Sequence, residues 1–336
     1  MSQGGSPRVS ILLPTHNRAD VLPFAIRSVL AQSVADFELL VVGDGCTDDT
    51  ATVVQGFGDA RIRWFDLPKG PGFGYGNRNV ALRQARGEIV AYLAHDDLWF
   101  PDHLARLLAP LERPGIEFTY SLQLRVSVTG RIEPMVFDMN DTAVWRAWLD
   151  KHAGYIAIVD VAHRRECYEK YGYWNEHLRQ RGDYELWMRF AHREPVPNFE
   201  YLIVPTSLRF VADWRRRPES RSRRLWRSLR VREGASLPAL QLDLAGSASE
   251  QEAAWKAIER APEEWVAGVR RAVQADLNRR GAYRFALSDY LEAGRRTLEQ
   301  ARLHKRDWVE FALPGAEANF QAPAQAGGPA QGENSR

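Results

Sequence analysis

Strand-sized apolar runs alternate with helix-forming segments through the first third of the chain. The runs with the length and composition of buried strands are Val9–Pro14, Phe37–Val42, Arg61–Phe65 and Ile89–Ala94. The segments between them have the apolar spacing of helices that lie on a sheet. This strand–helix alternation predicts an α/β fold, with a parallel sheet and helices on both of its faces.

The rest of the sequence is less regular. Glu117–Val128 alternates in polarity and meets Thr129-Gly130, which predicts a hairpin. A helix is expected to begin at Gly182-Asp183. Near the C-terminus, helical periodicity interrupted by residues such as Pro262 predicts a helical extension. The last residues, 314–336, are rich in Ala, Gln, Gly and Pro and are predicted to be disordered.

Composition limits the class of protein. The 336 residues are 45% hydrophobic, enough for a large core, and 45 basic residues nearly balance 43 acidic ones. The balanced charge argues against a charge-driven nucleic-acid binder. Two distant cysteines, Cys46 and Cys167, exclude a disulfide scaffold and a cysteine-rich zinc site. No apolar run has transmembrane length and no signal-peptide pattern opens the chain, so we expect a cytoplasmic protein.

Carboxylates follow the second and fourth predicted strands. Asp44 ends one strand, Asp96 and Asp97 follow the other, and Asp183 opens a later helix. Ligands of open α/β sheets bind beyond the carboxyl ends of the strands, so we expect these carboxylates near one rim. Adjacent carboxylates repel each other unless a cation or hydroxyl groups satisfy them, and Mg²⁺ and Mn²⁺ prefer carboxylates plus phosphate oxygens. The structural alternative is that Asp-Asp caps the helix after the strand.

A glycine-rich loop, Gly70–Gly76, precedes the third helical segment. It invites a dinucleotide-binding interpretation, but Tyr75 and Asn77 stand where the last glycine of G-x-G-x-x-G should be. We interpret it as a loop over a bound donor or as a plain connection.

Several motifs, taken in order, resemble glycosyltransferase family 2. They are Pro14-Thr-His-Asn-Arg18, Phe37-Glu-Leu-Leu-Val-Val-Gly-Asp-Gly-Cys-Thr-Asp-Asp-Thr50, Asn77-Arg-Asn79, Tyr92-Leu-Ala-His-Asp-Asp-Leu98 and Gly182-Asp-Tyr-Glu-Leu-Trp-Met-Arg189. Each motif alone is weak, but their order and spacing over about Val9 to Phe210 are specific. The resemblance implies the GT-A fold, a Rossmann-like and mostly parallel sheet with helices on both faces, followed here by the C-terminal helical extension.

The resemblance also implies roles for individual residues. Those that would bind the nucleotide are Pro14, Thr15, Asn17, Asp44, Arg78 and Asp96. Asp44 would accept a hydrogen bond from the pyrimidine ring, and Asp96 would face the ribose. Asp97 would bind a divalent metal, Mn²⁺ or Mg²⁺, on the diphosphate, and Asp183 would be the catalytic base. Trp174, ahead of Asp183, is a candidate for stacking on an acceptor sugar, although aromatic residues more often pack in a core.

Three positions depart from the family's usual pattern. Gly43 stands where the family usually has another Asp, His95 where many members have an acidic residue, and Gly182 where many have Glu before the base. The Asp that the chemistry needs is retained at each place, so we interpret the departures as tuning of the site. They leave the identity of the donor open.

The resemblance implies an inverting, metal-dependent glycosyltransferase that moves a sugar from a UDP- or dTDP-sugar to a hydroxyl of a glycan or lipid-linked saccharide. A metal would stabilise the leaving diphosphate while the base takes the acceptor's proton in a single displacement. One alternative is a sugar-nucleotide pyrophosphorylase, which would need a glycine-rich phosphate loop after the first strand. Another is a non-catalytic nucleotide-sugar-binding module, against which the retained carboxylates argue.

We expect four regions along the chain. They are a nucleotide-sugar-binding half at 1–122, an acceptor-binding and catalytic-base half at 123–212, a helical region at 213–313 and the tail at 314–336. The arginine-rich segment Trp214–Arg230 has two interpretations, a peripheral contact at the inner face of the membrane or a solvated helix. The C-terminal helices are expected to pack on the catalytic domain or on a second subunit, which leaves oligomer formation open.

Overall fold

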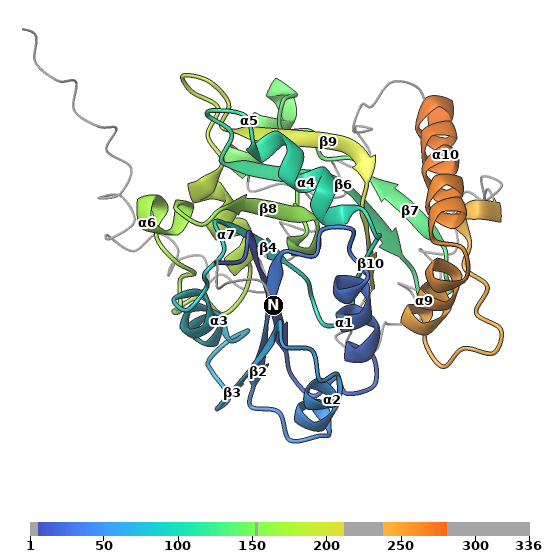
Figure 1. Cartoon of the computed structure of the whole chain (residues 1–336). Coiled ribbons are helices and arrows are strands. Elements are labelled where there is room, and N and C mark those ends of the chain that lie inside the picture. Colours follow the sequence, from blue (N-terminus) through green and yellow to red (C-terminus); the bar gives the residue numbers. More distant parts are fainter. Residues whose placement is uncertain (1–5, 152–153, 212–237, 281–336) are drawn as a thin grey trace, which may run out of the picture. The chain divides into compact units, whose positions relative to one another are not determined.

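The computed structural model describes residues 6–151, 154–211 and 238–280 (Figure 1). These residues all belong to the structural unit Met1–Leu287. The predicted tail and the arginine-rich segment Trp214–Arg230 lie outside the described residues, and the predictions made for them stay predictions.

The N-terminal part of the sheet is parallel, as the strand–helix alternation predicts. β1 (Val9–Thr15) lies between β2 (Phe37–Asp44) and β4 (Ile89–Tyr92), and β3 (Ile62–Leu67) pairs with the other side of β2. The connecting helices are α1 (Leu22–Leu30), α2 (Thr50–Gly56) and α3 (Tyr75–Leu82). Figure 1 shows α1 and α2 beside the part of the sheet that contains β1 and β2.

The second part of the sheet is mixed. Its strands are β5 (Leu98–Trp99), β6 (Phe118–Val126), β7 (Ile132–Met135), β8 (Val161–Arg164), β9 (Phe199–Pro205) and β10 (Ser207–Phe210). β8 runs antiparallel to both β4 and β6, and β6 and β7 form the predicted hairpin. β9 and β10 run parallel to β6. Within the described residues the strands form one ten-stranded sheet in the order β3-β2-β1-β4-β8-β6-β10-β5, with β7 and β9 paired to β6.

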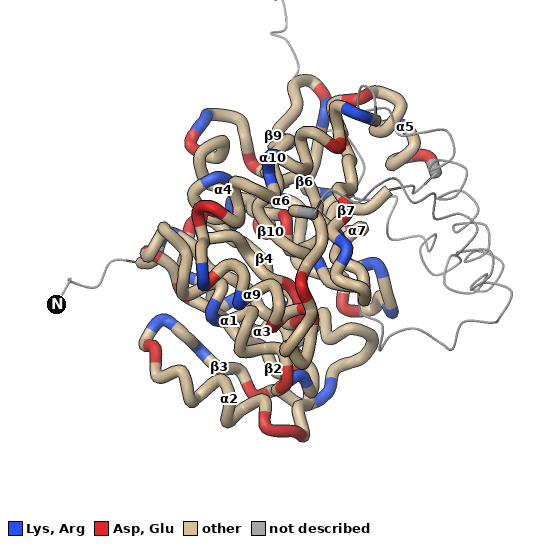
Figure 2. The backbone as a smooth tube through the Cα atoms, turned by 90° about the vertical axis from the view of Figure 1, so that its right-hand side faces the viewer, with Lys and Arg blue, Asp and Glu red and all other residues tan. Residues whose placement is uncertain are grey.

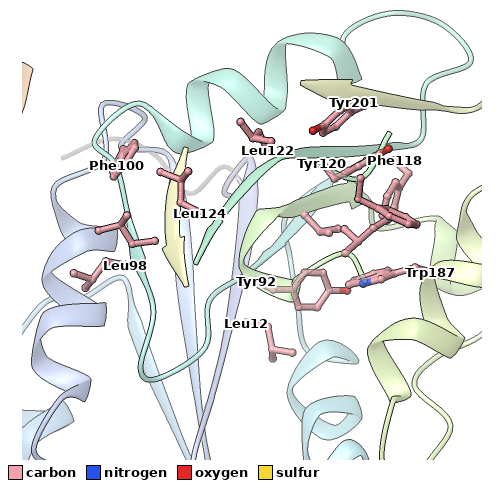
Figure 3. Packing of buried hydrophobic residues seen from close by; sticks show 14 of the residues in the cluster. Leu12, Tyr92, Leu98, Phe100, Phe118, Tyr120, Leu122, Leu124, Trp187 and Tyr201 are labelled. Carbon is pink, nitrogen blue, oxygen red and sulfur yellow. The ribbon is translucent and has the colours of Figure 1, made fainter. Parts of the chain in front are cut away.

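Side chains that alternate along β1 enter two hydrophobic clusters, one on each face of the sheet. The remaining helices are α4 (His103–Leu111), α5 (Thr142–Lys151), α6 (Cys167–Tyr171), α7 (Gly182–Phe190), α9 (Glu250–Arg260) and α10 (Pro262–Arg280). Ile11 and Leu13 pack in the cluster that contains α1 and α4, whereas Leu12 packs with Tyr92 and Trp187 of α7 (Figure 3). Because each face buries apolar side chains against helices, the predicted arrangement of helices on both faces is confirmed.

The helices α9 and α10 pack on the sheet domain of the same chain. Arg270 of α10 donates two hydrogen bonds to the Asp102 carboxylate, at 2.7 and 2.8 Å. Gln251 of α9 is buried, and its Nε2 donates to the backbone oxygen of Asp96 at 3.2 Å. Both helices are therefore tied to the segment that follows β4. An additional contact between subunits stays a prediction.

Residues of both charge signs are interspersed along the described backbone in the view of Figure 2. The predicted division between the two halves, at residue 122, lies within β6. Over residues 6–151, 154–211 and 238–280, no helix is both long and apolar enough to cross a membrane.

Candidate functional site

The carboxyl ends of β1, β2 and β4 meet at one rim of the sheet because these strands are parallel neighbours. Thr15 pairs in register with Gly43, the residue before Asp44. Leu12 pairs with Tyr92, so the chain that carries Asp96 leaves β4 beside the end of β1. This rim is where an open α/β sheet binds its ligands.

Two residues at the carboxyl end of β1 and just beyond it shape the rim. The Thr15 side chain is 2% exposed, and its Oγ1 has no hydrogen-bond partner among the described residues. Asn17 has a left-handed backbone, with φ of 50°, and links the segments that follow β1 and β2. The Thr47 backbone N–H donates to Asn17 Oδ1 at 2.7 Å, and Asn17 Nδ2 donates to Thr47 Oγ1 at 3.2 Å. Buried hydroxyls are normally paired, so Thr15 is a candidate to bind a ligand.

The glycine-rich loop holds Asp44. Lys69 Nζ pairs with one carboxylate oxygen, and the Gly70 N–H and Asn77 Nδ2 each donate to the other at 2.7 Å. Gly74 has φ of 69°, and a Cβ there would lie 2.7 Å from Asp44 Cγ. A pyrimidine that uses Asp44 must therefore share the carboxylate with this loop or displace Lys69. Sequence reasoning missed Lys69, whose only signal was its position beside the glycines, and it placed Asn77 in a motif without giving it a role.

Two of the departures from the family pattern have a steric reason. A Cβ at Gly43 would lie 2.4 Å from the ring of Trp64, which comes from β3. A Cβ at Gly182 would lie 2.5 Å from the ring of Tyr75, and the Gly182 N–H donates to the Tyr75 hydroxyl at 2.9 Å. An aromatic ring thus occupies the space that a larger residue would need at each position.

The adjacent carboxylates Asp96 and Asp97 are both buried, with 5% and 4% exposed. Asp97 Oδ1 accepts a hydrogen bond from the Phe210 N–H of β10 at 2.9 Å. Burial raises the pKa of Asp97 well above its ordinary value, and the negative charge of Asp96 raises it further. His95 Nε2 lies 3.8 Å from Asp96 Oδ1, so the third departure places a basic side chain beside this pair.

A divalent cation fits the chemistry of this pair. Burial disfavours the charged form of Asp97, and a cation bound there would offset that cost. In the part of the chain that the structure describes, no three His, Cys, Asp or Glu side chains gather as a metal cage. A pair of carboxylates is enough to bind a cation such as Mg²⁺ when phosphate oxygens and water supply its other ligands.

Asp183 begins α7, as predicted, and shares its neighbours with Asp97. Burial raises the pKa of Tyr155 well above its ordinary value, and the charges of Asp183 and Asp97 raise it further. The Arg209 guanidinium of β10 lies 4.9 Å from the centre of the Tyr155 ring and interacts with both carboxylates. The structure therefore brings Asp97 and Asp183 into one electrostatic environment. Tyr155 and Arg209 belong to no motif, and no sequence signal identified them.

Arg78 carries a positive charge into the same region. Its guanidinium lies 4.6 Å from the Trp174 ring centre and 5.1 Å from that of Tyr75. Its Nε is buried and has no hydrogen-bond partner in the described residues. Burial lowers the pKa of Arg78, while the charge of Asp183 is among the interactions that raise it. A desolvated guanidinium with an unused donor is suited to a diphosphate.

Trp174 requires a correction. The side chain is only 2% exposed, stacks on Tyr75 with 5.3 Å between ring centres and meets Trp187 edge-on. Its backbone N–H donates to Asn79 Oδ1 at 3.1 Å. Trp174 therefore packs in the core and supports Arg78, and it presents no open face to an acceptor sugar.

Asp160 is a buried carboxyl that makes the stability of the fold depend on pH. It accepts a hydrogen bond from Ser207 Oγ, its Oδ2 has no partner among the described residues, and burial raises its pKa from 3.8 to about 7. The folded state therefore binds more protons between these values, and the free energy of unfolding falls as pH rises from about 4 to 7. We expect Asp160→Asn to raise the melting temperature slightly at pH 5 and by several degrees at pH 8. Equal differences at the two pH values would contradict this expectation.

Comparison with known proteins finds a family model that matches the first part of the chain. Residues 10–152 match the model described as Glycosyl transferase family 2. An uncharacterized glycosyltransferase of Rickettsia typhi is 29% identical over 205 residues, which are 57% of this chain and 61% of that protein. The Escherichia coli UDP-Glc:alpha-D-GlcNAc-diphosphoundecaprenol beta-1,3-glucosyltransferase WfgD is 36% identical over 112 residues, which are 33% of this chain and 44% of WfgD. The chain thus spans less than two thirds of either relative.

A solved structure supports the fold. TarS 1–349 of S. aureus, in a crystal structure with UDP-GlcNAc, has a TM-score of 0.50 and 20% sequence identity to this chain. The match covers 63% of this chain and 60% of the TarS fragment.

Proposed function

Because residues 10–152 belong to glycosyltransferase family 2 and the sheet has the GT-A fold, we propose that this protein is an inverting glycosyltransferase. Its donor is a UDP- or dTDP-sugar, and its acceptor is a hydroxyl of a glycan or lipid-linked saccharide. The observation that carries the proposal is that the charges of Asp97 and Asp183 both act on Tyr155 and on the Arg209 guanidinium beside its ring. We therefore expect Asp97, near the diphosphate of the donor, and Asp183, the candidate base, to act on the same bound substrate.

The acceptor class rests on the relatives. WfgD is named for glucosyl transfer to a diphosphoundecaprenol-linked sugar, and its match to this chain supports an acceptor of the same class. A lipid-linked acceptor would bring this protein to the inner face of the membrane.

The nucleotide is held at the rim of β1 and β2. Asp44 accepts a hydrogen bond from the pyrimidine ring, Pro14, Thr15 and Asn17 line the nucleotide, and Asp96 faces the ribose. Arg78 binds the diphosphate, whose oxygens accept a hydrogen bond from the buried guanidinium Nε and carry the opposite charge.

Asp97, with Asp96 beside it, would hold Mn²⁺ or Mg²⁺. A bound divalent cation would stabilise the negative charge that grows on the diphosphate as the glycosidic bond breaks. Arg78 would bind the same diphosphate and add to that stabilisation.

Asp183 takes the proton of the acceptor hydroxyl. As the O–H bond breaks, the hydroxyl oxygen attacks the anomeric carbon and the bond from that carbon to the diphosphate oxygen breaks. One displacement from the opposite face inverts the anomeric configuration.

A thermal-shift screen tests the donor site. UDP, dTDP, GDP and CMP are each added with and without Mn²⁺ or Mg²⁺. A ligand at 100 times its dissociation constant stabilises the folded state by about 2.7 kcal/mol, so UDP or dTDP with metal is expected to raise the melting temperature by several degrees. No shift with any nucleotide would contradict the proposal and favour the non-catalytic module.

Variants of the Asp44 cluster sharpen that screen. Asp44→Asn is expected to reduce the UDP-induced shift, because an amide presents one acceptor oxygen in place of two. Lys69→Met is expected to increase it, because the pyrimidine then has no cation to displace from Asp44. Lys256→Met removes an exposed pair with Glu252 on α9 and serves as the matched control, with no change in the shift.

A further inference from the structure

Tyr75 of α3 holds the backbone immediately before the candidate base. The Gly182 N–H donates to the Tyr75 hydroxyl oxygen at 2.9 Å, and Asp183 is the next residue along α7. Gly182 and Tyr75 are both buried, so this N–H needs an acceptor within the protein. In the sequence, Tyr75 stands out only as a break in the glycine pattern of its loop.

The N-terminus of α7 is capped from another element. Among the described residues, its N-cap residue Arg181 makes no side-chain capping hydrogen bond, and its backbone is left-handed, with φ of 60°. Helix N-caps are normally Ser, Thr, Asp or Asn, whose side-chain oxygen accepts one of the first N–H groups. Here the acceptor oxygen comes from Tyr75, 107 residues earlier in the chain. The position of the first turn of α7 therefore depends on α3.

Packing holds the Tyr75 ring in one place. The ring stacks on Trp174 with 5.3 Å between ring centres and 13° between the planes. Asn79, one turn further along α3, donates to the Trp174 backbone oxygen at 2.8 Å and accepts from its N–H at 3.1 Å. A Cβ at Gly182 would lie 2.5 Å from the Tyr75 ring, so the ring and the backbone before Asp183 are in close contact. The hydroxyl is thus presented to Gly182 by a ring that has little freedom to move.

The same helix carries the candidate contact to the diphosphate. The Arg78 guanidinium lies 5.1 Å from the centre of the Tyr75 ring, within the range of a cation–π interaction. Tyr75 and Arg78 are three residues apart, so they lie on one face of α3. This face of α3 therefore joins the residue that would meet the diphosphate to the residue that holds the start of α7.

We propose that Tyr75 is a positioning residue for Asp183, which it holds in place through the Gly182 backbone. This inference rests on the proposed function, in which Asp183 accepts the proton of the acceptor hydroxyl. General-base catalysis requires the carboxylate to lie within hydrogen-bond reach of that hydroxyl. Helix ends fray, and the side chain of Asp183 moves with the backbone of the first turn. Pairing the Gly182 N–H limits that movement.

Tyr75→Phe tests the proposal, because it removes the hydroxyl and keeps the ring against Arg78 and Trp174. We expect kcat to fall about tenfold, since a small displacement of the base from the acceptor proton slows its transfer. The KM for the donor and the UDP-induced thermal shift are expected to stay at wild-type values, because the contact with Arg78 is retained. Parallel losses in kcat and in the UDP-induced shift would assign Tyr75 to donor binding and overturn the proposal.

A double variant separates positioning of the base from a general structural role. Tyr75→Phe is combined with Asp183→Asn, and the rate of transfer is measured with excess enzyme. We expect the double variant to have the same rate as Asp183→Asn alone, because a residue that acts only through the base has no effect once the base is lost. A further tenfold loss in the double variant would show that Tyr75 acts independently of Asp183, and the proposal would fail.

Tyr120→Phe is the matched control. The buried Tyr120 hydroxyl also accepts a backbone N–H, that of Met139, at 2.9 Å, and neither residue belongs to the candidate site. The control is expected to lower the melting temperature as Tyr75→Phe does and to leave kcat unchanged. A lower melting temperature of Tyr75→Phe with wild-type kcat would indicate a structural role alone and contradict the positioning role.

The outcome also separates this inference from the proposed function. If Asp183→Asn is strongly impaired while Tyr75→Phe has wild-type kcat, the positioning role is wrong and the base assignment stands. If Asp183→Asn is fully active, the base assignment fails, and the positioning role fails with it.

Discussion

Asp183→Asn is expected to lower kcat for sugar transfer by about 10²- to 10⁴-fold, the range that general-base catalysis contributes. An amide has nearly the shape of a carboxylate but accepts no proton at neutral pH, so the acceptor hydroxyl stays a poor nucleophile. The Tyr184 N–H donates to Asp183 Oδ1 at 2.9 Å, a hydrogen bond that the amide oxygen of Asn retains. The start of α7 should therefore keep its conformation, and nucleotide binding should be unchanged.

The measurement is the steady-state rate of transfer from a UDP-sugar, with the thermal shift by UDP recorded on the same preparation. Glu185→Gln is the control, because it makes the same carboxylate-to-amide change two residues further along α7. Glu185 pairs with Arg189, and the variant is expected to keep most of kcat. Wild-type turnover by Asp183→Asn would remove Asp183 from the mechanism.

Asp97→Asn is expected to abolish the extra thermal shift that Mn²⁺ or Mg²⁺ gives to a bound nucleotide. We also expect kcat to fall by about 10²- to 10³-fold, the typical cost of losing one electrostatic contact to the developing charge. The fold should tolerate the change, since the amide oxygen still accepts from the Phe210 N–H and the buried charge is removed. The melting temperature without ligand is therefore expected to equal or exceed that of the wild type.

Asp243→Asn serves as the control for this variant. Asp243 is an exposed carboxylate that accepts from the Ala245 N–H at 3.0 Å in a turn before α9. Its replacement is expected to leave the metal-dependent shift intact. Should metal still strengthen nucleotide binding to Asp97→Asn, the assignment of Asp97 to the metal fails.

Local patterns predicted the elements that carry the nucleotide half of the candidate site. The apolar runs that became β1, β2 and β4 are strand-sized, and a carboxylate that directly follows a parallel strand must lie at the rim of the sheet. Asp44, Asp96 and Asp97 were therefore identified from sequence position alone. The helix start at Asp183 was predicted in the same way.

Local patterns could not predict which side chains those carboxylates would meet. Lys69 reaches Asp44 because the glycine-rich loop folds back across the end of β2. Trp174 is buried because α3 and α7 bring Tyr75 and Trp187 against its ring. Its sequence context did not decide between core packing and stacking on an acceptor. These contacts depend on the path of loops, and periodicity carries no information about that path.

By itself, the sequence determined the class of fold, the parallel half of the sheet and the carboxylates at its rim, because each follows from spacing within a short segment. Only the tertiary structure decided that Arg209 interacts with the charges of both Asp97 and Asp183, because Arg209 comes from β10, which lies between β6 and β5 in the sheet. It also decided that Gln251 of α9 supports the backbone of Asp96. The order of strands in a sheet and the docking of a distant helix arise from packing between segments far apart in the chain, and such packing leaves no local pattern.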